Sequence, residues 1–600
     1  MDENTEKRYF LGLDIGTDSV GWAVTDSEYH ILRRKGKAMW GVRLFDAAET
    51  AAQRRTFRTN RRRIQRRKQR IRLLQQLFAE EIAKIDSGFF QRMSDSAFWQ
   101  EDKSEQQIYS LFSSHPLVDE AVSYENIYNT DVEYYKEFPT IYHLRSALIR
   151  EKKKFDLRLI YLAIHHLMKH RGHFLFNGSI NNVTSFHMTF QTFTDCLLDE
   201  FGVELECDSE DRFAEILKDK HSRKTAKCSE LEELCHVEKA DKQLKELFKL
   251  ITGMKANLSV IFSEDELAEI EHNKVSFSES SYDEVRLALE DEIQERAGIL
   301  DIFHGVYSWA ILAEILEGGE YEGNSYLSVA KVNSYQKHGN DLRILRRLIR
   351  EYCPEDYKIF FSSAGKDNYC AYVGSLKKNG KKQQIKRCSQ EDFYKALKKI
   401  LNKMPSEHPE VRGILVEVEN GTFLPLQVSK DNGVIPYQVN KIELEKILQN
   451  AVEHFPFLKN MDDECGKTVS EKIMKLFEFR IPYYVGPLNT AGGENCWMVR
   501  KEDGRIYPWN FDDKVDTDRS AEEFIRRMTN QCTYLLHEDV IPKNSLLYSE
   551  FMVLNELNNI KIRSEKLSVE LKQDIVSNLF KRHKQVTGKK LMNYLKSRVM

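Results

Sequence analysis

The segment AAQRRTFRTNRRRIQRRKQRIRLLQQLF, residues 51–78, constrains the fold most, because it is densely basic and no acidic residue follows before Glu80. Like charges four residues apart each destabilise a helix by about 0.2–0.5 kcal/mol, and no glutamate is interleaved to relieve them. Four apolar residues nevertheless recur every seven positions, which predicts one helix over 51–85 along a narrow apolar stripe. The four are Phe57, Ile64, Ile71 and Phe78. A helix simply exposed to solvent fits this pattern poorly.

Ten of the eleven basic residues in this segment are arginines. Arginine makes bidentate contacts with phosphate that lysine cannot make. The backbone of a nucleic acid is therefore the expected partner, with an affinity that falls steeply with salt. Most of these contacts should position the nucleic acid rather than identify its bases. We expect the apolar stripe to be buried in a line and the arginines to face an open, electropositive channel.

The net charge of −3 hides an uneven distribution. Residues 33–72 hold sixteen Lys and Arg against Asp46 and Glu49, a local charge of +14 that leaves −17 for the rest of the chain. Such a basic block in an acidic chain indicates a local polyanionic partner. At 600 residues, the chain should also divide into several domains.

Three strands are predicted over residues 8–46: RYFLGLDIG, SVGWAVTD and KGKAMWGVRLFD. Asp14 lies within the first strand, where a carboxylate is costly to bury unless it is paired or binds a metal. Three interpretations are open for this segment: an RNase H-like nuclease whose strand aspartate binds Mg²⁺, an actin-like kinase or ATPase, and an acid that caps the turn beside Gly16. The kinase is disfavoured because its second motif, Asp-x-Gly-x-Gly-Thr, does not occur, and AGGEN at 491–495 lacks the acid.

Helical patterns dominate after Glu49, so the predicted class is α+β and predominantly α-helical. Ten scattered cysteines form no Cys-x-x-Cys pair, which disfavours a zinc site and a disulfide framework. No apolar run approaches the ~18 residues of a membrane span, the N-terminus does not resemble a signal peptide, and a cytoplasmic location is expected. Helices are predicted over 51–85, 141–150, 156–176, 340–352, 392–403, 441–454, 520–531 and 566–599.

Together these features resemble one family, the type II CRISPR-associated RNA-guided DNA endonucleases (the Cas nine family). GLDIGTDSVGWAVTD, residues 12–26, is similar to the first RuvC-like motif of that family, and the arginine segment is similar to its bridge helix. The resemblance is weakest at 180–300, where an inserted helical subdomain is expected to vary. Segments similar to its recognition lobe are FPTIYHLRSALI (138–149), DLRLIYLAIHHLMKHRGHFL (156–175), LRILRRLIREYCPEDYKIFF (342–361), DNGVIPYQV (431–439), FRIPYYVGPL (479–488) and YPWNFDD (507–513).

The resemblance implies roles for individual residues. Asp14 matches the catalytic, metal-binding aspartate of the RuvC-like site. Arg171, Arg480 and Asn530 match contacts to the backbone of the guide or target strand, although the two arginines could instead cap or bridge helices and Asn530 could end one. The residues expected to grip the guide RNA from the bridge helix are Arg55, Arg58, Arg62, Arg63, Arg66, Arg67 and Arg70.

The function implied by the resemblance is RNA-guided DNA cleavage in a type II CRISPR adaptive immune system. The implied partners are crRNA, tracrRNA and double-stranded target DNA, and the implied cofactor is Mg²⁺, with Mn²⁺ as an alternative. The protein would be monomeric, bacterial and cytoplasmic. The family's remaining RuvC-like segments, its HNH nuclease and its PAM-reading domain have no counterpart in these 600 residues. We therefore expect this chain alone to bind RNA without cutting DNA; the alternative is a nuclease-dead RNA-binding and targeting module.

The resemblance also implies a division of the chain, from a first RuvC-like segment to the start of the last helical recognition domain. Between them lie the bridge helix and a recognition lobe interrupted by the inserted helical subdomain. In chain order these six parts are 1–50, 51–85, 86–182, 183–305, 306–515 and 516–600.

Overall fold

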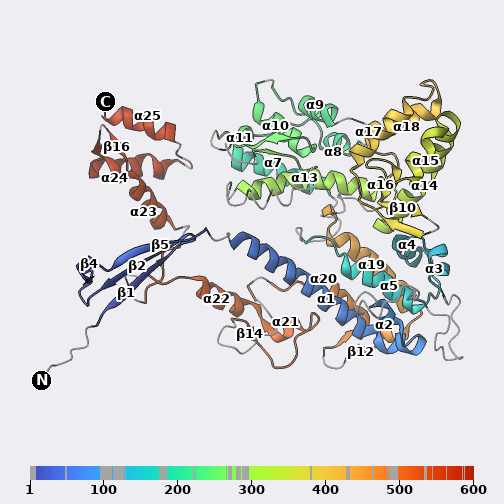
Figure 1. The fold of residues 1–600 in the computed structure, drawn as a ribbon, viewed down its shortest axis with the longest axis horizontal. Coiled ribbons are helices and arrows are strands. Elements are labelled where there is room, and N and C mark those ends of the chain that lie inside the picture. Colours follow the sequence, from blue (N-terminus) through green and yellow to red (C-terminus); the bar gives the residue numbers. More distant parts are fainter. Residues whose placement is uncertain are drawn as a thin grey trace. The chain divides into compact units, whose positions relative to one another are not determined.

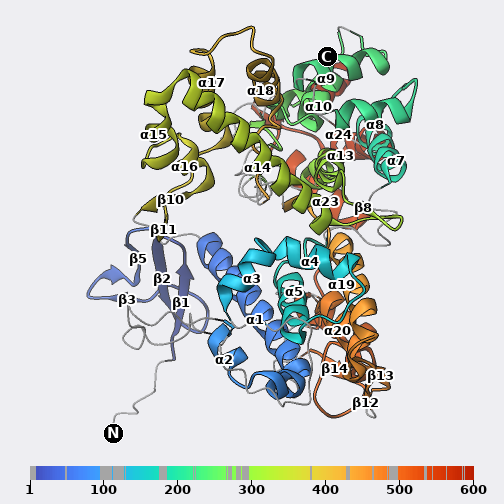
Figure 2. The same cartoon turned by 90° about the vertical axis from the view of Figure 1, so that its right-hand side faces the viewer.

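The protein is described here from a computed structural model, which divides into two compact units, Met1–Glu478 and Phe479–Met600. The elements of both units are drawn in Figures 1 and 2. The residues described by the structure are 8–47, 51–94, 111–112, 128, 130–174, 185–219, 222, 224–238, 240–264, 267, 273–278, 286, 289, 293, 296–378, 381–427, 433–462, 465–482, 484–485, 497–532, 535, 537–542, 545–562, 564–583, 586 and 588–599.

A three-stranded antiparallel sheet of order β1-β2-β5 confirms the predicted strands. Asp14 pairs with Gly21 across the first two strands, and the N–H of Gly16 donates to the carbonyl of Ser19 at 2.8 Å to close the turn between them. Many apolar side chains of this sheet are exposed, including Ile15. The strands are β1 (Phe10–Ile15), β2 (Ser19–Thr25) and β5 (Trp40–Leu44), with a short hairpin of β3 (Arg33–Arg34) and β4 (Lys37–Ala38) inserted before β5.

Helix α1 (Ala51–Ile85) has the predicted bounds of 51–85. Its second half is held by helices that come from distant parts of the sequence, among them α5 (Leu157–Lys169) and α20 (Val469–Glu478). The rings of Tyr161 and Phe457 pack edge-on against Phe78, with centroids 5.5 and 5.6 Å away. Such edge-to-face pairs stabilise a core beyond the area they bury.

An ion pair of Asp86 with Arg158 fixes the direction of α5 along α1. Asp86 directly follows α1, and its Oδ2 accepts from Nη1 of Arg158 at 3.0 Å. Arg158 lies in the first turn of α5 and also pairs with Asp156 at 2.7 Å. All three side chains are buried. The start of α5 is thereby attached to the end of α1, and α5 runs back along it.

A second buried ion pair, between Arg145 and Glu443, joins α4 (Ile141–Arg150) to α19 (Tyr437–Val452). The guanidinium donates to Oε2 of Glu443 at 2.6 and 2.9 Å and to Oδ1 of Asn440 at 2.9 Å. The other oxygen of Glu443 accepts the backbone N–H of Ser328 at 2.6 Å. Both charged groups are therefore buried, and each is hydrogen-bonded to its partner and to at least one further group. Short elements complete this part of the first unit: α2 (Phe89–Met93), α3 (Asp131–Glu137), a 3-10 turn (Pro456–Lys459), β12 (Met461–Asp462) and β13 (Lys467–Thr468).

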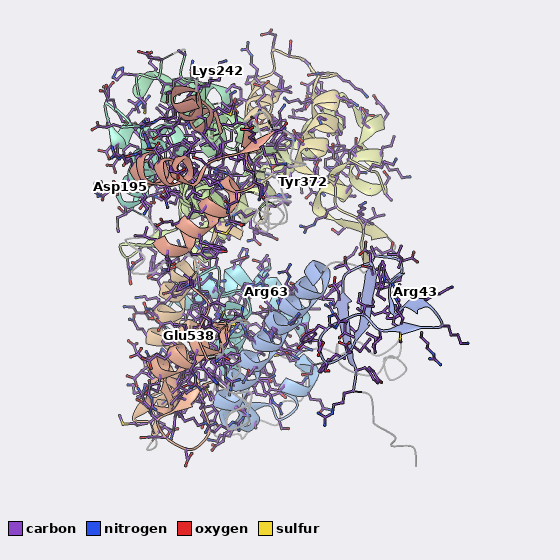
Figure 3. The ribbon with its side chains drawn as sticks, turned by 90° about the vertical axis from the view of Figure 1, so that its left-hand side faces the viewer. Arg43, Arg63, Asp195, Lys242, Tyr372 and Glu538 are labelled. Atoms are coloured by element: carbon purple, nitrogen blue, oxygen red, sulfur yellow. The ribbon has the colours of Figure 1, made fainter. Side chains whose placement is uncertain are left out.

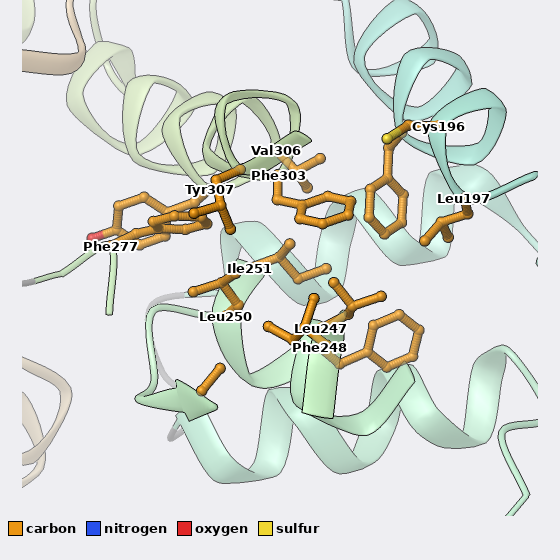
Figure 4. Packing of buried hydrophobic residues seen from close by; sticks show 14 of the residues in the cluster. Cys196, Leu197, Leu247, Phe248, Leu250, Ile251, Phe277, Phe303, Val306 and Tyr307 are labelled. Carbon is orange, nitrogen blue, oxygen red and sulfur yellow. The ribbon is translucent and has the colours of Figure 1, made fainter. Parts of the chain in front are cut away.

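A helical subdomain with its own core follows α5 in the chain. Figure 4 shows Phe303 and Val306 of α13 (Arg296–Leu316) in the same core as Leu247 and Phe248 of α10 (Lys242–Ile251). By length and composition α13 could cross a membrane, but its apolar side chains here line a protein core. The other elements are α7 (Phe186–Cys196), a π-helical turn (Leu197–Phe201), α8 (Glu210–Lys218), α9 (Lys224–Leu234), β6 (Ala256–Asn257), α11 (Leu258–Ile261) and β7 (Lys274–Val275).

Helix α14 (Leu327–Tyr352) leads into another core, in which the rings of Tyr372 and Phe393 stack with centroids 4.2 Å apart. The hydroxyl of Ser389 accepts the backbone N–H of Asp392 and caps α17, as serine commonly does at a helix start. The further elements are β8 (Glu320–Tyr321), β9 (Asn324–Ser325), α15 (Pro354–Ser362), α16 (Tyr369–Val373), β10 (Ser375–Lys378), β11 (Lys381–Gln384), α17 (Gln390–Leu401) and α18 (Pro409–Asn420).

The second unit is helical with short hairpins. Its elements are β14 (Val499–Arg500), α21 (Phe511–Lys514), β15 (Val515–Asp516), α22 (Thr517–Met528), α23 (Leu546–Leu557), β16 (Lys561–Ile562), β17 (Glu565–Lys566), α24 (Val569–Asn578), a 3-10 turn (Phe580–Arg582) and α25 (Gly588–Val599).

The predominantly helical α+β class is confirmed. Three predicted helices are wrong in extent. The one predicted over 340–352 is only the last part of α14, which begins at Leu327. The one predicted over 566–599 is two helices, α24 and α25, separated by a 3-10 turn. The one predicted over 156–176 ends at Lys169, because Gly172 has a φ of +94° and the chain there pairs with another segment. The six-part division of the chain remains a prediction.

Candidate nucleic-acid interface

The first half of α1 presents its arginines to solvent, and Arg63 is labelled there in Figure 3. In the part of the chain that the structure describes, no carboxylate pairs with a basic residue between Arg54 and Arg72. The first described ion pairs along the helix join Lys84 to Glu80 at 3.5 Å and to Glu81 at 2.7 Å. This positive charge is therefore uncompensated by the described residues. The exposed arginines are Arg54, Arg55, Arg58, Arg61, Arg62, Arg63 and Arg66.

Arg70 lies where the exposed half of α1 meets the packed half. Its Nε is buried and has no hydrogen-bond partner among the described residues. Burial, followed by the neighbouring charges of Arg67 and Arg66, lowers the pKa of Arg70 to about 10. A buried donor without a partner is costly. An anion bound beside Arg70 would accept a hydrogen bond from its Nε and reduce the repulsion between Arg70, Arg67 and Arg66.

The predicted burial of the whole apolar stripe is wrong at two of its four residues. Phe78 is fully buried and Ile71 half-buried, but Phe57 is 71% and Ile64 45% exposed. Helix α5 has 13 residues against 35 in α1, so at 1.5 Å per residue it covers only part of the longer helix. The apolar spacing predicted the helix correctly but not how much of it other helices cover.

Arg171 lies after α5 in the segment HRGHF. Its guanidinium donates to the carbonyl of Phe477 and stacks on the ring of Phe174, 4.6 Å from the centroid. Phe174 in turn stacks on Tyr437 at 4.3 Å. These contacts give Arg171 a structural role in joining the segment to α19 and α20. Its predicted contact with guide or target strand remains a prediction.

Gly172 permits this arrangement, and we expect Gly172→Ala to disrupt it. A Cβ at this position would lie 2.5 Å from the carbonyl oxygen of Ile435, in addition to the left-handed backbone. Left-handed strain alone costs about 1–3 kcal/mol for a residue with a side chain. Hydrogen exchange should therefore be accelerated at the N–H of His173, which donates to Ile435 at 3.0 Å. Gly298→Ala in α13, where a Cβ would meet nothing, is the control; equal exchange in the two variants would contradict the prediction.

Arg480 and Asn530 belong to the second unit, and both side chains are exposed. Asn530 follows α22, and its carbonyl accepts the N–H of Val540 at 2.9 Å. Their predicted contacts with nucleic acid remain predictions.

Asp14 is exposed on β1, as expected of a residue in an open site. Magnesium in proteins is held by oxygen ligands in an octahedral shell. Across the described ranges, no group of three or more His, Cys, Asp or Glu could hold a metal. The described residues therefore do not by themselves fit the implied Mg²⁺ site, and Asp14 is at most one of its ligands.

A basic cavity on α14 is a site that sequence reasoning missed. It has a volume of about 580 Å³ and is lined from one face of the helix. Nε of Arg346 is buried there without a hydrogen-bond partner among the described residues, as in Arg70. The signal was present in LRILRRLIRE, whose arginines recur at helical spacing. The lining residues are Gly339, Leu342, Arg343, Arg346, Arg347, Arg350 and Glu351.

Comparison with known proteins gives two family matches. The REC lobe of CRISPR-associated endonuclease Cas9 matches residues 186–599, and the bridge helix of CRISPR-associated endonuclease Cas9 matches residues 54–86. Similar curated proteins include the CRISPR-associated endonuclease Cas9 of Listeria innocua serovar 6a, 37% identical over 99% of this chain and 43% of the relative. The protein of the same name from Streptococcus mutans serotype c is 37% identical over 98% of this chain and 42% of the relative. The chain thus spans less than half the length of these relatives.

Proposed function

Because the chain belongs to the Cas9 family of CRISPR-associated endonucleases, we propose that it provides the guide-RNA grip of an RNA-guided DNA endonuclease. The observation that carries this proposal is the row of exposed arginines on α1, which have no ion-pair partner among the described residues and which end at the buried Nε of Arg70. In such enzymes the protein recognises the heteroduplex by shape and backbone, while base pairing with the guide supplies sequence specificity. The partners are accordingly crRNA, tracrRNA and target DNA.

The exposed apolar residues of α1 are compatible with this proposal. Phe57 and Ile64 lie on the same uncovered half of the helix as the arginines. Nucleic-acid sites combine cationic side chains with rings or apolar groups that contact bases and sugars. We assign the α14 cavity to phosphates of the same RNA, because Arg346 repeats the buried, partnerless donor of Arg70.

Asp14 would contribute one ligand to a divalent-metal nuclease site in a full-length protein that carries this segment. A bound Mg²⁺ would stabilise the charge that develops during phosphodiester hydrolysis. Asp14 is the ligand that the described residues offer to such a site, which would need further ligands besides it.

Simultaneous replacement of Arg62, Arg63, Arg66 and Arg70 by alanine tests the proposed grip. For single-stranded nucleic acid, each phosphate contact contributes about 0.7 to the slope of log affinity against log salt. Losing four contacts should lower that slope by about 3 and weaken binding on the order of a hundredfold at 0.15 M salt. The measurement is guide-RNA binding by fluorescence anisotropy over a range of salt concentrations.

The matched control removes four cations elsewhere, at Lys395, Lys398, Lys399 and Lys403 in and after α17. Two of these already face carboxylates, Lys398 with Glu419 and Lys403 with Asp356. The control should therefore retain the wild-type slope. An unchanged slope in the arginine variant would show that α1 does not contact the RNA, and the proposed function would fail.

A further inference from the structure

The end of α5 lies beside the arginines of α1. Two contacts place the two helices side by side in opposite directions: Arg158 binds Asp86, and Tyr161 packs on Phe78. The positive charge of Arg67 on α1 acts on His170 and lowers its pKa, in agreement with this arrangement. Figure 2 shows α5 alongside α1. Because the two helices are antiparallel, the C-terminal end of α5 lies toward the exposed, arginine-rich half of α1. The sequence HHLMKH, residues 165–170, spans the end of α5 and the residue after it, so three histidines lie in this region.

His170, directly after α5, is exposed at this position. Partial burial and then the positive charges of Lys169, Arg67 and Arg145 lower its pKa below the ordinary value of 6.5. Within the described ranges, no carboxylate contacts its ring. Glu443, the acid paired with Arg145, is fully buried and occupied by that guanidinium. The charges that act on the imidazole are all positive, and its ring lies against that of His166 with centroids 4.9 Å apart, so it is largely neutral near pH 7.

The other two imidazoles of α5 differ from His170. His166 points inward, where its Nδ1 is 3.1 Å from Nη1 of Arg145, and burial followed by that charge lowers its pKa to about 2. His165 is half-buried behind the ring of Tyr161, and burial, followed by Lys169 and His170, lowers its pKa to about 4. Of the three, only His170 is exposed.

We propose that His170 is a further phosphate-binding residue of the α1 interface, which takes up a proton when the RNA backbone binds beside Arg67. This inference rests on the proposed function and adds to it that RNA binding is coupled to protonation of His170. The bound phosphates reverse the local field, because they place negative charge where only Lys169, Arg67 and Arg145 act in the free protein. Imidazolium then donates hydrogen bonds to phosphate oxygens, a charge-assisted contact.

The direction of the pH dependence follows from linkage. A group whose pKa is higher in the complex than in the free protein adds affinity that is complete below the free-state pKa. That affinity is lost as pH rises through the pKa of the complex. The free-state pKa of His170 lies below 6.5, so the loss spans the range from acid to neutral pH. Each unit of difference between the two pKa values corresponds to a tenfold change in affinity.

The test is binding of a fluorescent 20-nucleotide oligouridylate RNA at constant ionic strength between pH 5.5 and 8. Uracil gains no proton in this range, so pH acts on the protein. We expect the wild-type chain to bind more tightly at pH 5.5 than at pH 8, by at most about tenfold for a shift of one pKa unit. His170→Phe should lose more affinity at pH 5.5 than at pH 8, and His170→Arg, with a permanent cation, should remove the pH dependence while binding tightly throughout.

His187→Phe is the matched control, because His187 is exposed in α7 but pairs with Glu210 at 2.9 Å. It should keep the wild-type ratio between the two pH values. Calorimetry in two buffers of different ionisation enthalpy should also show less proton uptake for His170→Phe than for wild type.

If His170→Phe keeps the full wild-type pH ratio, or if wild-type binding does not vary with pH, the proposal is overturned. That result is distinguishable from a failure of the proposed function. The guide-RNA grip would still stand if replacing the four α1 arginines lowered the salt slope, and would fall only if that slope were unchanged.

Discussion

Replacing Asp14 by alanine in a full-length protein that carries this segment is expected to abolish cutting of the non-target DNA strand. The exposed carboxylate on β1 is the one metal ligand assigned to this chain. A metal site that loses a charged ligand loses both metal affinity and stabilisation of the transition state. We expect a rate loss of at least the order of 10²–10³. Guide binding and cutting of the target strand by a separate HNH site should persist, giving a nickase.

The assay is strand-resolved cleavage of an end-labelled DNA duplex with guide RNA and Mg²⁺. Asp18→Ala is the control, because Asp18 is an exposed acid in the turn that follows β1. It should still cut both strands. If Asp14→Ala also cut both strands, Asp14 would not be a metal ligand.

The second large effect is expected at the buried pair of Arg145 and Glu443. Glu443→Gln should leave the guanidinium buried at 1% exposure without its counter-charge. Breaking such a pair costs about 3–5 kcal/mol, whereas replacing both partners by apolar residues is often nearly neutral. The free energy of local opening should be measured by hydrogen exchange of amides in α4 and α19, because a protein with several cores need not unfold in one step.

The double variant Arg145→Met/Glu443→Leu should recover most of that loss. Glu215→Gln, which breaks the exposed pair of Arg212 and Glu215, should cost less than about 1 kcal/mol. If the double variant were at least as destabilised as Glu443→Gln, the cost would come from packing rather than from the unpaired charge.

Local patterns predicted local structure well in this chain. The bounds of α1 and α4 agree with the predicted 51–85 and 141–150 because spacing and charge within the segment determine them. The end of the helix predicted over 156–176 depended instead on Gly172 and on pairing of His173 with Pro436, more than 260 residues away. Contacts of that kind leave no periodic trace in the sequence.

In the candidate site, too, features that depend on the local sequence could be predicted, and features that depend on distant contacts could not. The arginines of α1 could be identified from sequence because their charge is uncompensated within the segment itself. The exposure of Phe57 could not, since it depends on how far α5 reaches. The cavity at Arg346 also escaped notice, because α14 mixes arginines with acids and looks like an ordinary charged helix until the buried Nε is seen.

The division of α1 into a packed and an exposed half has a consequence for how the arginine array is formed. Starting a helix is the costly step, because several residues must be ordered for the first hydrogen bond, whereas each later residue adds a bond at little cost. The packed half, with Phe78 and Ile82 fully buried, is a permanent nucleus within the fold. The arginine-rich half of α1, whose like charges repel one another, needs only to extend the helix from this nucleus. The arginines are thus held in helical register before any polyanion arrives, and binding does not have to supply the free energy of nucleation.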